Sequence, residues 1–292
     1  MPALFRSGWA PCLFAVLVWG ATFATTKRLL EALPPTEILL ARFVVGYLAL
    51  WALAPRRLPW QGWRTEARMA LAGVLGIALY FHFENQALVH ARAGMVAVVV
   101  CVSPLLTALL ARLLGRVRRL GRGYWLGFAL AMGGVALTVT GGDPAALRGA
   151  WQGAAFGLLG ALTWSCYTLL PLPRGGDGLA VTRRTFFWGL LAILPLCLPE
   201  ADAWRVGPLL GWPALWRLLF LGLLASALCY VAWNAAVARL GGVRATLLLY
   251  LNPVVGVLTA ALLLGEPLDA PILLGVALTL TGVALSTRSA PH

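Results

Sequence analysis

The sequence predicts an all-α membrane protein with ten transmembrane helices, and three observations lead to this prediction. Of the 292 residues, 61% are hydrophobic and only 11% are charged, and the mean hydropathy is +0.85. A soluble protein could not cover so much apolar surface with so few charges. The apolar runs approach the roughly 20 residues that a helix needs to cross a bilayer core of about 30 Å. The two halves of the chain also resemble each other.

The apolar runs are separated by short connections rich in Arg, Pro and Gly, and no connection is long enough to form a soluble domain. The net charge of +13 could suggest nucleic-acid binding, but the basic residues punctuate the apolar runs instead of clustering on one module. We therefore expect no nucleic-acid partner. The ten expected spans are residues 9–26, 37–54, 69–90, 94–111, 123–141, 151–171, 184–199, 214–237, 243–264 and 271–287.

The distribution of Lys and Arg predicts the orientation of these spans. With both termini in the cytoplasm, the inner segments contain 16 basic residues and the outer segments six, while Arg42 lies within the second span. Cytoplasmic connections of membrane proteins are enriched in Lys and Arg. We therefore expect a multi-pass protein of the inner (plasma) membrane with both termini in the cytoplasm.

An internal repeat is visible in the last helix of each half. Gly127–Thr138 (GFALAMGGVALT) aligns without a gap on Gly275–Ser286 (GVALTLTGVALS). Because each half contains five spans, an odd number, the second half must enter the membrane from the opposite side. The prediction is therefore two inverted five-helix repeats, residues 1–141 and 151–287, an architecture whose binding sites form near the midplane between the repeats.

The third span carries an unusual set of polar residues. Tyr80, His82, Glu84 and Asn85 interrupt an apolar run, and Glu84 lies about 9 Å inside the outer end at 1.5 Å per residue. Ionisable groups within membrane spans are costly and commonly functional. Glu84 is thus a candidate for proton exchange during transport, with His82 as a second titrating group. The alternatives are a structural pairing of Glu84 with a nearby arginine and a hydrogen-bonded core histidine.

Arg42 lies five residues into the second span. The favoured interpretation is that its side chain extends toward the outer headgroups. The alternative is that it faces a cavity, where it could attract a substrate carboxylate or take part in coupling or gating with Glu84.

Aromatic and amide side chains suggest a substrate cavity between the repeats. Trp19 and Trp164 occupy corresponding places in the first helix of each half, and the eighth span repeats the polar-aromatic pattern of the third. Aromatic rings offer large stacking surfaces with polar edges, whereas several other tryptophans have the positions of interface-belt residues. The expected cavity residues are Trp19, Tyr80, His82, Asn85, Trp164, Tyr230, Trp233, Asn234, Tyr250 and Asn252.

Two prolines fall inside expected spans. Pro104 and Pro253 lie in the fourth and ninth spans, where each removes a backbone donor. We expect a helix break at each, with Asn252 presenting a polar group beside the second.

Three segments resemble a known family. Val18–Phe23, Glu84–Leu114 and Asn252–Leu285 are similar to the ten-helix exporters of the drug/metabolite transporter superfamily that have two EamA-type domains. The last segment carries the family's LGE motif, ending in Glu266, whereas the first repeat has Arg116 at that place. The resemblance implies efflux of amino acids, other metabolites or drugs.

The expected function is secondary active export of small amphipathic metabolites such as amino acids by alternating access, with proton coupling as an option. Carriers of drugs, sugars or nucleotide-type metabolites with the same fold are alternatives, as are a non-transporting membrane protein and an intramembrane enzyme. We expect no enzyme, because the chain has no HExxH, GxSxG or CxxC motif. With three histidines we also expect no metal site and no cofactor. Monomeric and homodimeric forms are both compatible with the sequence.

Overall fold

The computed structural model describes residues 8–53, 55, 58–117, 119–171, 178–204, 206–240 and 248–288. This part of the chain consists of helices joined by short turns and loops, and it contains no strand. The elements are α2 (Trp9–Leu29), α3 (Pro35–Leu53), α4 (Trp63–Gly73), η1 (Val74–Leu79), α5 (Tyr80–His90), α6 (Ala93–Val100), α7 (Ser103–Leu113), α8 (Arg122–Thr140), η2 (Pro144–Ala146), α9 (Leu147–Thr168), α10 (Gly178–Cys197), η3 (Leu198–Ala203), α11 (Val206–Leu210), α12 (Trp212–Leu219), η4 (Phe220–Leu228), α13 (Cys229–Leu240), η5 (Leu249–Leu251), α15 (Asn252–Leu264) and α16 (Ala270–Arg288).

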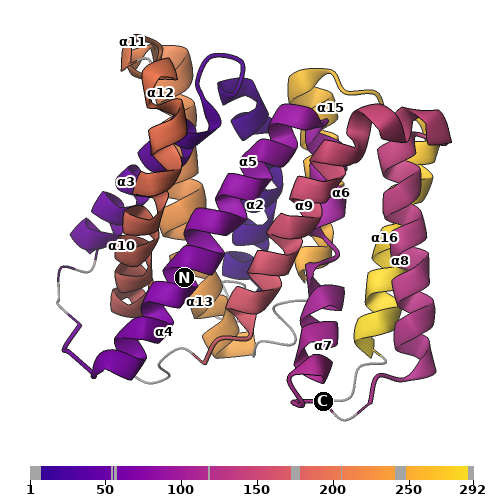
Figure 1. Cartoon of the computed structure of the whole chain (residues 1–292), viewed down its shortest axis with the longest axis horizontal. Helices are drawn as coiled ribbons and strands as arrows, with labels where there is room; N and C mark the ends of the chain where they lie inside the picture. The colour runs from indigo at the N-terminus through magenta and orange to yellow at the C-terminus, as the bar shows by residue number, and fades with distance from the viewer. Residues whose placement is uncertain are drawn as a thin grey trace.

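Six helical stretches in the described ranges are long and apolar enough to cross a membrane. Their lengths of 19 to 26 residues meet the thickness of a bilayer core. The helices run side by side along the vertical direction of Figure 1, with α4, α7 and the C-terminal end of α16 at the lower end. The chain is therefore an all-α membrane protein, as the composition predicts.

Several helices extend beyond the expected spans. α4 begins at Trp63 instead of residue 69, because Glu66 is buried and has partners on α10. Its carboxylate accepts hydrogen bonds from Arg184 Nε at 2.7 Å and from the Trp188 indole at 2.5 Å. An acidic residue that the sequence assigns to a loop is thus part of a helix–helix contact.

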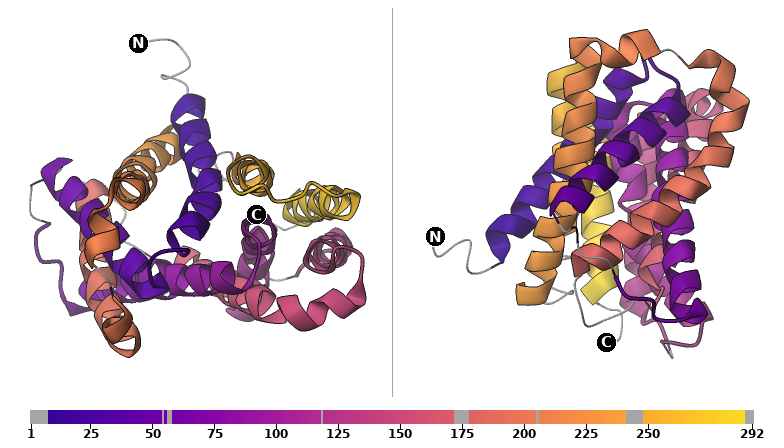
Figure 2. Two further views of the ribbon diagram at one scale, coloured as in Figure 1. Left: turned by 90° about the horizontal axis from the view of Figure 1, so that it is seen from above. Right: turned by 90° about the vertical axis from the view of Figure 1, so that its left-hand side faces the viewer.

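The helices of the two halves are interleaved. α5 packs against α9 and α13 against α2; α10 packs against α4 and η1, and α3 against η4. α15 lies between α2 and α6, while α8 and α16 form a pair at one edge of the molecule (Figures 1 and 2). The largest contacts of several helices are therefore with helices of the other half.

The α8–α16 pair is close because glycines line it. A Cβ atom added to Gly134 would lie 2.6 Å from the Gly275 carbonyl oxygen, and one added to Gly275 would lie 2.7 Å from the Gly134 carbonyl oxygen. Thr279 also donates a hydrogen bond to the Ala131 carbonyl at 3.4 Å, across a sequence separation of 148. This separation equals the offset of the sequence repeat. Small residues at such interfaces allow membrane helices to approach backbone to backbone.

Both halves contain helix irregularities at corresponding places. The long helices α4–α5 and α12–α13 contain the π-helical segments η1 and η4. Such segments are rare in proteins overall, but those that occur are frequently found at functional sites. Pro104 is the second residue of α7, and Pro253 is the second residue of α15. Proline is tolerated there because the first turn of a helix has no intrahelical acceptor for its missing N–H. α6 ends at Val100 and α7 begins at Ser103, so the helix is interrupted just before Pro104.

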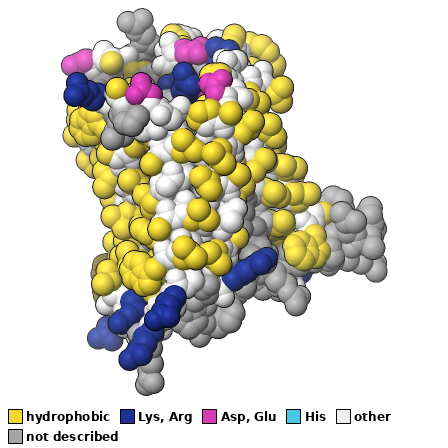
Figure 3. Space-filling view, turned by 90° about the vertical axis from the view of Figure 1, so that its right-hand side faces the viewer, with side chains coloured by type: hydrophobic (Ala, Val, Ile, Leu, Met, Phe, Trp, Pro, Cys, Tyr) yellow, Lys and Arg dark blue, Asp and Glu magenta, His cyan; other side chains and the backbone are white. Residues whose placement is uncertain are grey.

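The surface carries an apolar belt with charges at its two ends. Figure 3 shows hydrophobic side chains over the middle of one face, Lys and Arg at the lower end, and Asp and Glu together with basic residues at the upper end. This pattern is typical of a protein that meets water only beyond the bilayer core.

Candidate functional site

Two Trp–Tyr pairs lie between the halves of the molecule. The Trp19 ring on α2 contacts the Tyr230 ring on α13 edge-on, with centroids 5.9 Å apart. The Trp164 ring on α9 lies 5.0 Å from the Tyr80 ring on α5. Each pair joins the first helix of one half to the third long helix of the other half. The two tryptophans that correspond in sequence therefore have corresponding partners in space.

Three phenylalanines connect these pairs. Phe81 lies 4.6 Å from Tyr80 and 4.9 Å from Phe43, centroid to centroid. Phe186 lies 5.3 Å from Phe43 and 5.4 Å from Tyr230. Edge-to-face contacts at these distances are favourable for aromatic side chains. The rings form one aromatic cluster that runs across the interior from α9 to α13.

Arg42 lies in this cluster. Its side chain does not extend to the membrane surface, so the favoured sequence interpretation is wrong: the residue is 3% exposed. Its Nε donates to Ser226 Oγ at 3.0 Å, and its guanidinium carbon lies 4.2 Å from the Phe81 ring centroid. The hydrogen bond and the cation–π contact stabilise the charge in the interior.

Glu84 is equally buried, with 2% of its surface exposed. Its carboxyl group interacts electrostatically with the Arg42 guanidinium, and the Tyr80 hydroxyl, one helical turn earlier, is placed to hydrogen-bond with it. Its Oε1 atom has no hydrogen-bond partner among the described residues. A buried polar atom without a partner is costly. The arrangement therefore has spare hydrogen-bonding capacity at the centre of the cluster.

Some of the residues predicted for the site lie elsewhere. The half-buried His82 ring packs against Phe83, with centroids 5.6 Å apart. Asn85 donates to the Pro35 carbonyl at 2.9 Å and so links α5 to the start of α3. Asn252 begins α15, and its Oδ1 is buried without a partner among the described residues.

Trp233 belongs to the aromatic cluster through Trp19, whose ring centroid is 5.5 Å away. The Trp19 indole N–H also donates to the Ala225 carbonyl in η4 at 2.9 Å. The side chains of Asn234 and Tyr250 fall outside the described residues.

A cavity adjoins the cluster, and of the residues that line it only Tyr230 is among those predicted from the sequence. Tyr167 lies three residues after Trp164 and packs 5.1 Å from it, a helical spacing that could have revealed it. Ser226, the partner of Arg42, lies four residues before Tyr230 and could have been found in the same way. The cavity is lined by Ile77, Tyr167, Val181, Thr182, Thr185, Phe186 and Tyr230.

Comparison with known proteins shows the family and the fold of the chain. Residues 7–140 and 151–288 each match the model of the EamA-like transporter family. A crystal structure of another protein shares the fold, with a TM-score of 0.63, 21% identity, and coverage of 98% of this chain and 99% of that one.

Three relatives carry names that describe transport. A "Probable terminal-alkyne amino-acid exporter" of Streptantibioticus cattleyicolor is 30% identical over 98% of this chain and 94% of its own length. A "Probable amino-acid metabolite efflux pump" of Salmonella typhimurium is 28% identical over 94% of this chain and 92% of its own. The "Uncharacterized inner membrane transporter YedA" of Escherichia coli is 27% identical over 94% and 89%. The chain belongs to the EamA-like transporter family, and it is a membrane transporter, not an enzyme.

Proposed function

We propose that this protein is a secondary active transporter that exports small amphipathic metabolites such as amino acids by alternating access. Its substrate site lies between two inverted five-helix repeats, residues 1–141 and 151–287. The observation that carries the proposal is the matched pair of contacts Trp19–Tyr230 and Trp164–Tyr80, which flank one buried charged cluster.

The packing of the helices supports the inverted repeat and ten spans. The contact of α5 with α9 has a counterpart in that of α13 with α2, and the contact of α10 with α4 has one in that of α3 with η4. Exchanging the halves converts each contact into the other. Alternating access in such folds is largely a rocking of one repeat against the other around a fixed site.

The chemistry of the cluster supports a zwitterionic or neutral substrate. Arg42 offers a buried cation to a carboxylate, and Glu84 offers an unpartnered acceptor to an ammonium group or a proton. The surrounding rings of Tyr80, Tyr230 and Phe81 would contact an apolar side chain. The printed names of two relatives, an amino-acid exporter and an amino-acid metabolite efflux pump, agree with this class.

The charge pattern supports an inner-membrane location with both termini in the cytoplasm. Basic residues gather at the lower end in Figure 3, the end at which α4 begins and α16 ends in Figure 1. Cytoplasmic ends of membrane proteins are rich in Lys and Arg. The upper end is accordingly the outer end.

Counterflow in proteoliposomes tests the function. Vesicles are loaded with an unlabelled amino-acid pool, and uptake of labelled amino acids is compared for wild type, Arg42→Met and the control Arg92→Gln, which changes an exposed arginine. The proposal expects uptake by wild type and the control and little uptake by Arg42→Met. Absence of uptake by folded wild-type protein for every amino acid would contradict the amino-acid class, and equal uptake by Arg42→Met would contradict the site.

A further inference from the structure

Four helix ends meet at the upper end of the molecule, away from the aromatic cluster. Lys27, in the last turn of α2, donates through its amine to the Ala91 carbonyl at 2.9 Å and to the Leu88 carbonyl. These carbonyls belong to the C-terminal end of α5, where helical acceptors lack intrahelical partners and the helix dipole is negative. A cation thus satisfies the end of α5.

Glu266 binds the start of α6, two residues after the Ala91 carbonyl that Lys27 binds. Its carboxylate accepts hydrogen bonds from the backbone N–H groups of Ala93 at 2.7 Å and Gly94 at 3.0 Å, the first residues of α6. Charge-assisted bonds of this kind are stronger than neutral ones. Lys27 and Glu266 also attract each other electrostatically. The corner between α5 and α6 is therefore held by a cation from the first half and an anion from the second.

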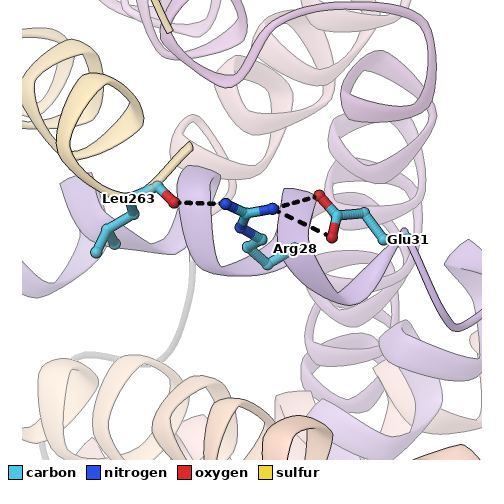
Figure 4. A network of polar contacts seen from close by, with 3 residues as sticks. All are labelled: Arg28, Glu31 and Leu263. Atoms are coloured by element: carbon cyan, nitrogen blue, oxygen red, sulfur yellow. Dashed lines mark hydrogen bonds and ion pairs between the residues drawn. The ribbon is translucent and has the colours of Figure 1, made fainter. Parts of the chain in front are cut away.

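A second connection ties α2 to α15 at the same end. Arg28 Nη2 donates to the Leu263 carbonyl at 2.9 Å, and Nη1 pairs with Glu31 at 3.0 Å (Figure 4). Beneath these polar contacts lies an apolar layer that includes Phe23 and Val96, both buried. The upper end therefore has polar contacts between α2, α5, α6 and α15 and a layer of buried apolar side chains.

The opposite end is built differently. Gly115 and Gly265 end α7 and α15 with similar left-handed backbones, φ 71° and 68°, so Arg116 has the place that corresponds to Glu266. Arg116 donates to the Leu169 carbonyl at 2.6 Å, just beyond α9. An arginine cannot accept hydrogen bonds from a helix N-terminus. The carboxylate clamp is therefore present at the upper end, and the residue at the corresponding place of the lower end has the opposite charge.

The cavity also lies toward the lower end. α9 runs antiparallel to α5, because Gly153 packs on Ala91 and Gly160 lies nearest to the Tyr80 carbonyl. The last turn of α9, which contributes Tyr167 to the cavity, is thus remote from the clamped corner. The structure has its hollow near one end and its polar clamp at the other.

We propose that Lys27 and Glu266 are gating residues that hold the upper end closed during the transport cycle. The inference rests on the proposed function, because only a transporter needs this end to open. Each contact joins a side chain to backbone groups and can be exchanged for water, so the clamp is reversible. Loss of one charge from it raises the open fraction of the upper end at least about tenfold, because charge-assisted hydrogen bonds are stronger than neutral ones.

The test measures access to a single cysteine below the clamp. Val96→Cys is introduced into a chain whose five native cysteines are changed to alanine, and reaction with a membrane-impermeant maleimide is followed in sealed vesicles of each orientation. Glu266→Gln is compared with Asp269→Asn, which removes the same charge from an exposed residue of the same connection. Lys27→Gln is the second gate variant. Hydrogen exchange at the amides of Val96–Val100 in the native-cysteine chain gives the same comparison without the reporter.

We expect labelling about tenfold faster in Glu266→Gln and Lys27→Gln than in Asp269→Asn, with exchange in α6 accelerated in the same order. Equal labelling and exchange in all folded variants would overturn the gate. Rapid labelling without either gate substitution would also overturn it, because this end would already be open. Faster labelling of the gate variants from the cytoplasmic side supports the gate and overturns the assigned orientation. Faster labelling in a chain that shows no counterflow supports the gate and overturns the proposed function.

Discussion

Arg42 and Glu84 offer the most direct perturbation of the site. Arg42→Met removes the hydrogen bond to Ser226, the contact with the Phe81 ring and the cation that interacts electrostatically with Glu84. Removing one partner of a buried charged pair costs about 3–5 kcal/mol, because the other charge remains uncompensated. Glu84→Gln, which keeps the shape of the side chain, removes the anion in the same way.

The double variant Arg42→Met/Glu84→Gln should be more stable than the sum of the single effects predicts. It leaves no uncompensated charge at a site where both residues are at most 3% exposed. We expect a coupling energy of about 2 kcal/mol, within the range for buried residues in direct interaction. This coupling should be present at high pH and disappear as the pH falls and the Glu84 carboxylate becomes protonated.

The assay is unfolding in mixed micelles of detergent and SDS, followed by tryptophan fluorescence at several pH values. The three variants and wild type together form a double-mutant cycle. Additive effects at every pH would refute the reasoning, because they would mean that the two groups do not interact across the cluster.

Three further predictions follow from other contacts. Gly134→Ala, where the added Cβ would lie 2.6 Å from a carbonyl oxygen of α16, should lower the free energy of unfolding by about 1–3 kcal/mol. Gly133→Ala, with open space around the added Cβ, should raise it by about 0.5–1 kcal/mol. Thermal unfolding in detergent compares the two variants, and equal shifts would contradict the packing of α8 on α16. Glu66→Ala should cost about 2 kcal/mol more than Glu66→Gln, because only the amide retains an acceptor for Trp188, and similar losses would contradict that bond. Trp19→Phe removes an indole donor and should lower stability by about 1 kcal/mol and counterflow severalfold, an effect absent if Trp19 is only a lipid-facing residue.

The membrane class and the correspondence of Trp19 with Trp164 can be predicted from the sequence, because hydropathy is a local property and the internal repeat relates the two halves. Hydropathy depends only on composition within a span, and an internal repeat is visible without a structure. The offset of 148 aligns Gly127 with Gly275 and Gly134 with Gly282, whereas in space Gly134 meets Gly275 and Gly127 meets Gly282.

The burial of Arg42 could not be predicted, because its partner Ser226 is 184 residues away. A positive charge near the end of a span extends to the headgroups unless something inside the protein accepts it. Ser226 and the Phe81 ring accept it here, and no local pattern reveals that they meet. For the same reason Glu66, whose partners are on α10, falls in a connection between the predicted spans and not in a helix.

The end of α2, beyond Lys27, could not be predicted from the sequence. The expected first span stops at residue 26 because a lysine is costly inside a membrane, yet α2 continues to Leu29. The amine is satisfied by carbonyl groups at the end of α5, more than 60 residues away in the chain. The boundary depends on a tertiary contact and therefore cannot be derived from the span itself.

Counterflow at several pH values, comparing wild type with Glu84→Gln, tests the central claim most directly. We expect labelled amino-acid uptake by wild type that varies with pH, and exchange by Glu84→Gln that does not. Uptake with the same pH dependence in both proteins would keep the carrier and remove Glu84 from coupling. No flux of any amino acid through either folded protein would contradict export of this class of substrate.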